Sequence, residues 1–151
     1  MKATNKILWV AGWACTWPQS FRNLIENKFL GFEHQWLGEA DQVSFHWDLG
    51  QFSHVISWSL GSQRTLTQLS NIHGLKQKTL ATSIQFIHIA PAFEFCEEEF
   101  GWDLRILTRM QKMLGRSPQS VLSDFYALVG IPQDQQTEQL AQYTQDGDSK
   151  T

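Results

Sequence analysis

One serine lies in a pattern that suits nucleophilic chemistry. An apolar stretch, His54-Val55-Ile56, continues through Ser57-Trp58-Ser59-Leu60-Gly61 into a segment with helical spacing. A small residue two positions before a serine and a glycine two positions after it, between a strand and a helix, is typical of a nucleophile elbow. Such a turn exposes the serine hydroxyl for attack on a carbonyl carbon. Ser59 is therefore the candidate nucleophile, and Ser57 replaces the glycine that usually opens the pattern.

Two backbone N–H groups could stabilise the negative charge that such an attack creates. Leu60 would begin the helix after Ser59, where free N–H groups and the helix dipole favour an anion. The earlier apolar run Ile7–Val10 ends in Ala11-Gly12-Trp13, which would place the Trp13 N–H at a neighbouring strand end. We therefore expect an oxyanion hole formed by Trp13 and Leu60. The alternative is a glycine-containing strand end in another α/β domain with an incidental serine.

The segments around these residues alternate between strand and helix patterns. Apolar runs predict strands near 7–10, 32–37, 55–58 and 84–90, with helical spacing after the first and third. The segment 41–51 is ambiguous, and we interpret it as a short crossover because parallel strands need one between them. This order predicts an α/β fold with a parallel sheet. After Pro91 the apolar spacing is purely helical.

Three stretches carry a family resemblance: Ala11-Gly12-Trp13, Trp58-Ser59-Leu60-Gly61 and Ile89-Ala90-Pro91-Ala92-Phe93. They resemble the α/β-hydrolase superfamily, and most of all its carboxylesterases that cleave pimeloyl-[acyl-carrier protein] methyl ester in biotin synthesis. The resemblance covers about residues 5–131, which correspond to the N-terminal part of that family. It implies that the four strands are the family's third to sixth, in the spatial order 4-3-5-6.

The resemblance also divides the chain. It implies a partial α/β-hydrolase core over residues 1–92 and a partial helical cap over 93–131, with the family's C-terminal strands absent. Residues 132–151 contain six Gln and few apolar side chains, so we expect this polar tail to be a frayed helix or disordered.

The same resemblance assigns roles to residues. Ser59 is similar to the family's nucleophile, and Trp13 and Leu60 match its oxyanion positions. The implied substrate is a small acyl ester, carried by an acyl-carrier protein in the biotin pathway, with no cofactor and no metal. Five residues are expected to contact this substrate: Trp13, Phe93, Phe125, Tyr126 and Val129.

The chain departs from the family where a base is needed. The family's Asp and His follow later strands, and no His follows His88 here. A serine without a base is a poor nucleophile, and for His88 itself a packing role is favoured. Two hypotheses stay open. The chain is an esterase that needs further sequence, or a second chain paired at the open sheet edge, or it is a truncated protein without catalysis.

Composition excludes several other classes. The chain has 151 residues, 42% hydrophobic and 18% charged, which suits one globular domain. A net charge of −3 argues against nucleic-acid binding, and no apolar run is long enough for a membrane span. Two Cys cannot form a disulfide framework, so a cytoplasmic location is expected.

Overall fold

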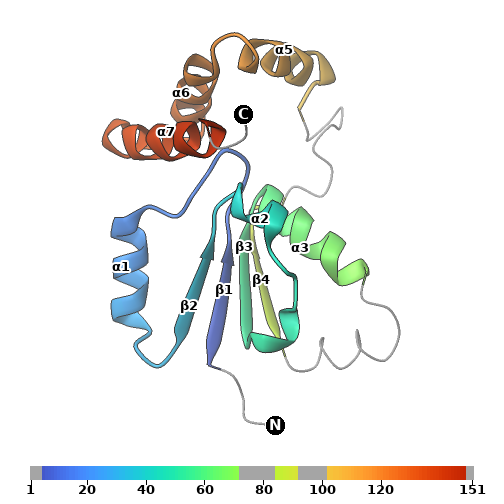
Figure 1. Cartoon of the computed structure of the whole chain (residues 1–151), viewed down its shortest axis with the longest axis vertical. Helices are drawn as coiled ribbons and strands as arrows, with labels where there is room; N and C mark the ends of the chain where they lie inside the picture. Colours follow the sequence, from blue (N-terminus) through green and yellow to red (C-terminus); the bar gives the residue numbers. More distant parts are fainter. Residues whose placement is uncertain (1–4, 72–83, 92–101, 149–151) are drawn as a thin grey trace. The chain divides into compact units, whose positions relative to one another are not determined.

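The computed structural model describes residues 5–71, 84–91 and 102–148, with side chains as far as residue 141. The chain divides into two compact units, Met1–Pro91 and Ala92–Thr151. Figure 1 shows the helices and strands of each unit.

The first unit is built on a four-stranded sheet (Figure 1). Its strands are β1 (Lys6–Val10), β2 (Glu33–Leu37), β3 (His54–Trp58) and β4 (Gln85–Ile89). The order is β2-β1-β3-β4, and every neighbouring pair is parallel. The predicted α/β class with a parallel sheet is therefore confirmed.

Helical segments connect these strands. Helix α1 (Gln19–Lys28) joins β1 to β2, and α3 (Leu60–Ser70) follows β3. Between β2 and β3 lie the short helix α2 (Asp41–Ser44) and the 3₁₀ turn η1 (Leu49–Gln51). The prediction of a crossover over 41–51, in place of a strand, is confirmed.

One face of the sheet carries the aliphatic core. The register pairs Leu8 with Val55 and Val55 with Phe86, so these side chains share a face. Leu69 of α3 packs against this group. The buried members of the core are Leu8, Val10, Leu37, Leu49, Phe52, Val55 and Ile84. Because side chains alternate between the two faces along each strand, burial of this face determines which residues at the strand ends point toward α3.

The opposite face carries aromatic rings beneath α1. Trp9 and Trp36 stack with ring centroids 4.7 Å apart, and Phe21 of α1 packs edge-on against both. The helical spacing of Phe21, Leu24, Ile25 and Phe29 predicts one apolar face, yet Leu24 is 54% exposed, and Phe29, just after the helix, is 47% exposed. That expectation is corrected in part: the helix packs on the ring layer through Phe21, and Ile25 is partly buried, whereas Leu24 meets solvent.

The second unit contains three described helices. They are α5 (Leu104–Leu114), α6 (Pro118–Leu128) and α7 (Gln133–Asp148). Among the residues of the tail that the structure describes, α7 is helical, which suits a segment in which six of sixteen residues are Gln, a good helix former. Across the described residues, no helix is both long and apolar enough to cross a membrane.

Candidate functional site

Ser59 has a backbone conformation that L-residues rarely adopt. Its φ is 52° and its ψ is −122°, at the single residue between β3 and α3. Two hydrogen bonds hold this turn: Ser59 N–H donates to Ile89 O at 3.0 Å, and Ser62 N–H donates to Ser59 O at 2.9 Å. Strained backbone of this kind persists only where the surroundings enforce it, and it is concentrated at functional sites.

Two glycines allow the chain to approach Ser59 closely. A Cβ on Gly61 would lie 2.7 Å from Val10 O and closer still to Ala11 O, so α3 begins directly against the end of β1. A Cβ on Gly12 would lie 3.1 Å from Ser59 Cβ. The small residues of the sequence pattern therefore serve a steric need, because larger side chains would separate α3 from the sheet.

Backbone strain is concentrated at one edge of the sheet. Three of the described non-glycine residues have positive φ: Ala14 at 53°, Ser59 at 52° and Ala90 at 44°. They follow the carboxyl ends of β1, β3 and β4 respectively. Ligand sites in parallel α/β sheets form beyond the carboxyl ends of the strands. The strained residues therefore lie where a site is expected.

The structure brings the expected oxyanion segments to Ser59. Leu60 is the first residue of α3, where N–H groups have no partner within the helix. Trp13 is half-buried and directly follows Gly12, whose Cα faces Ser59 Cβ. The Trp13 and Leu60 backbones thus belong to the two segments that flank Ser59.

A polar cluster lies on the core face beside the elbow. Ser57 Oγ donates to Ser62 Oγ at 3.1 Å and shares a hydrogen bond with His88 Nδ1 at 2.7 Å. Ser57 and Ser62 are fully buried. Burial lowers the pKa of His88 from 6.5, which favours the neutral imidazole. His88 therefore interacts with Ser57, and its packing under a helix stays a prediction.

A second polar cluster surrounds the loop after β1. Ala14 N–H donates to Glu39 Oε2 at 2.6 Å, and Gln42 Nε2 donates to Ala11 O at 2.8 Å. Arg64 of α3 reaches both partners: its Nη1 donates to Gln42 Oε1 at 3.1 Å, and its Nη2 lies 3.5 Å from Glu39 Oε1. The loop, the β2–α2 turn and α3 are thus joined by side chains.

Cys15 lies in the same loop and is inert as a nucleophile. Its side chain is buried, and burial together with the charge of Glu39 raises its pKa to about 12. Because the thiolate is the reactive form of cysteine, Cys15 stays an unreactive thiol at neutral pH.

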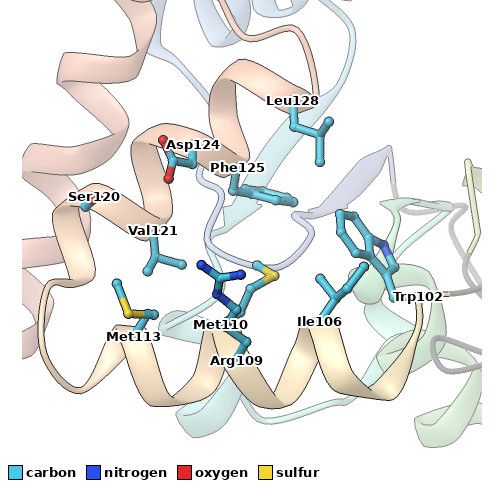
Figure 2. A pocket seen from close by; sticks show the side chains of 10 residues that line it. All are labelled: Trp102, Ile106, Arg109, Met110, Met113, Ser120, Val121, Asp124, Phe125 and Leu128. Atoms are coloured by element: carbon cyan, nitrogen blue, oxygen red, sulfur yellow. The ribbon is translucent and has the colours of Figure 1, made fainter.

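The remaining candidate residues lie in the helical unit or outside the described residues. Phe125 points into a groove of about 340 Å³ between α5 and α6, beside Met110 and Trp102 (Figure 2). Tyr126 is fully buried, and Val129 is 42% exposed. The expected substrate contact Phe93 lies outside the described residues.

The other histidines that the structure describes give no evidence of a metal or acid–base site, and His73 lies outside the described residues. His46 and Asp48 are exposed side chains, and His34 accepts a hydrogen bond from Trp9 Nε1 at 3.1 Å. Among the residues that the structure describes, no group of three His, Cys, Asp or Glu side chains could hold a metal ion.

Sequence reasoning did not find the clusters around Ser57 and Glu39. The pairing of His88 with Ser57 depends on the β3–β4 register, which places the two residues opposite one another. One available signal was Arg64, five residues after Ser59 in an otherwise neutral helix. A charged side chain close to a core needs a partner, but the sequence does not say which one.

Comparison with known proteins adds no relative. The chain matches no protein-family model, no curated protein and no solved structure.

Proposed function

We propose that this chain is a serine carboxylester hydrolase of the α/β-hydrolase type, with Ser59 as its nucleophile. One observation carries the proposal: Ser59 is held at a φ of 52° on the turn between β3 and α3. A serine on such a strained strand-to-helix turn presents its hydroxyl at the carboxyl edge of the sheet. The close approach of Gly12 to Ser59 supports the same interpretation.

The proposed reaction begins with attack of Ser59 Oγ on the ester carbonyl carbon. The Trp13 and Leu60 N–H groups stabilise the oxyanion that forms. Collapse of this intermediate releases the alcohol and leaves an acyl-serine, which water then hydrolyses. A base must take the Ser59 proton and return it to the leaving oxygen. In this proposal that base lies outside the described residues, because His88 Nδ1 is bonded to Ser57.

The proposed substrate is a small acyl ester. Its assignment as pimeloyl-[acyl-carrier protein] methyl ester rests on the sequence resemblance, as does the correspondence of the sheet to the family order 4-3-5-6. The apolar groove beside Phe125 supports binding of an acyl chain. Trp13, Phe93, Tyr126 and Val129 remain proposed contacts of the same substrate.

A second candidate is a non-catalytic protein or one half of a two-chain enzyme. Two observations favour it. The imidazole of His88 interacts with Ser57 instead of Ser59, and apolar side chains on β4 are open to solvent, with Ile87 45% and Ile89 47% exposed. A partner chain that covers this face and supplies a base would account for both.

Labelling with a fluorophosphonate probe tests the first candidate. We expect rapid modification confined to the peptide that contains Ser59, read by mass spectrometry of the intact chain and its peptides. Ser59→Ala should abolish the modification. The matched control Ser44→Ala removes an exposed hydroxyl in α2 and should leave it unchanged. If folded protein is not labelled, Ser59 has no base in this chain and the second candidate is favoured.

A further inference from the structure

The loop that carries Trp13 is held by side chains on both sides of the Gly12–Trp13 peptide. On the N-terminal side, Ala11 N–H donates to Leu37 O at 3.0 Å, and Ala11 O accepts from Gln42 Nε2 at 2.8 Å. On the C-terminal side, Ala14 N–H donates to Glu39 Oε2 at 2.6 Å. The peptides before and after Gly12–Trp13 therefore have fixed planes.

Fixing both neighbours restricts the peptide between them. A peptide unit is planar, so its orientation is set by the dihedral angles at the two flanking Cα atoms. Here those atoms belong to Gly12 and Trp13, and each also belongs to a peptide that a side chain holds. The strained φ of 53° at Ala14 is kept by the short bond from its N–H to Glu39. Glu39 and Gln42 thus restrict the orientations open to the Gly12–Trp13 peptide, which carries the Trp13 N–H.

Arg64 links these two side chains to the helix that follows Ser59. Its Nη1 donates to Gln42 Oε1 at 3.1 Å and to Glu39 O at 3.3 Å, and its Nη2 lies 3.5 Å from Glu39 Oε1. Gln42 is 4% exposed, and the Glu39 and Arg64 side chains are 23% and 33% exposed. Water therefore competes little for the Gln42 bonds, and both ends of that amide have a protein partner.

We propose that Glu39, Gln42 and Arg64 form a clamp that aims the Trp13 N–H toward Ser59, with Glu39 as its principal positioning residue. The clamp fixes the position of the loop after β1 relative to α3. The two proposed oxyanion donors, Trp13 and Leu60, therefore keep the same position relative to each other. Oxyanion stabilisation depends on donors that are already oriented before reaction. The inference rests on the proposed function for its role in catalysis, whereas the clamp itself is a property of the loop.

The test compares Glu39→Ala and Glu39→Gln with the wild-type chain. The matched control is Glu33→Gln, which makes the same chemical change at an exposed glutamate paired with Lys6. Amide proton shifts and hydrogen-exchange rates of Trp13 and Ala14 are read by nuclear magnetic resonance. The rate of fluorophosphonate labelling at Ser59 is read separately. Circular dichroism and cooperative unfolding establish that each variant is folded.

The clamp predicts a specific pattern. A carboxylate acceptor gives a strong hydrogen bond, so the Ala14 amide proton should be shifted downfield in the wild type. It should move upfield in Glu39→Ala, with faster exchange at both amides and labelling slowed at least ~10-fold, below the ~100-fold cost of losing an oxyanion donor outright. Glu39→Gln keeps an acceptor oxygen and should restore part of each effect. Glu33→Gln should change none of them.

Two results separate failure of the clamp from failure of the proposed function. If Glu39→Ala is folded and leaves both amides unchanged, the clamp is wrong whatever the labelling shows. If the wild type is not labelled but the amides respond as described, the clamp stands and the esterase proposal fails. If Glu39→Ala does not fold, the same measurements on Arg64→Lys test the clamp. A single ammonium cannot bond Gln42 and Glu39 in the geometry of the guanidinium.

Discussion

At the scale of single residues, the elbow depends on polar atoms that lie beside it. Ser57 replaces a glycine of the usual pattern, and its hydroxyl would carry a desolvation cost if left without a partner in this fully buried position. The Ser57 hydroxyl has two hydrogen-bond partners, Ser62 Oγ at 3.1 Å and His88 Nδ1 at 2.7 Å. The substitution is therefore compatible with the turn because neighbouring elements supply hydrogen bonds to the extra hydroxyl.

His88 makes the stability of the first unit depend on pH. Burial lowers its pKa from 6.5, so the native state binds this proton less readily than the unfolded chain. The stability contributed by neutral His88 is present above pH 6.5 and is lost as the pH falls from 6.5 toward the lowered native value. We expect His88→Gln to remove this component from the free energy of unfolding, measured in urea between pH 7 and pH 5.

His46→Gln is the control, because His46 has an exposed side chain. Its pH dependence should match that of the wild type. If His88→Gln also retained the wild-type dependence, burial of His88 would not favour the neutral over the charged imidazole, and the expected contribution would be wrong.

At the scale of elements, the site depends on how closely α3 approaches β1. Gly61 lies where a Cβ would overlap the backbone oxygens of Val10 and Ala11. Gly61→Ala should therefore lower the free energy of unfolding by about 1–3 kcal/mol, as overpacking of a tight contact does. Because the backbone of β1 cannot yield locally, we also expect slower labelling of Ser59. Urea unfolding and probe kinetics measure the two effects.

Gly31→Ala is the matched control for this change. No atom lies within 4 Å of a Cβ at Gly31, so the same substitution meets no steric obstacle there. Its free energy of unfolding should stay within about 1 kcal/mol of the wild type. Equal losses at Gly31 and Gly61 would contradict the close approach of α3 to β1.

The sequence was informative about elements and less so about contacts between them. The apolar run before Ser57 and the glycine after Ser59 sufficed to predict the strand, the turn and the helix, because each is a local pattern. The bond from Glu39 to Ala14 joins residues 25 positions apart, and no local pattern encodes it. Similarly, the spacing of Leu24 predicts a helix, but its exposure depends on the aromatic rings that cover the sheet face.

At the scale of the whole molecule, one sheet face has apolar side chains without a described cover. The β3–β4 register places Ile87 on the face of Ile56, opposite the core face of Val55. Ile87 is 45% exposed and Ile89 is 47% exposed, on a strand that ends the sheet among the residues the structure describes. Exposed apolar strands at a sheet edge favour association with another chain.

We therefore expect the purified chain to associate in a concentration-dependent way, measured by sedimentation velocity. Ile87→Lys places a charge on this face and should shift the distribution toward monomer. Leu30→Lys should leave it unchanged, because Leu30 is 84% exposed in the turn after α1 and lies off the sheet. A chain that remains monomeric at all concentrations would remove one of the two arguments for a partner. The base that the esterase proposal requires would then have to be sought within the chain itself.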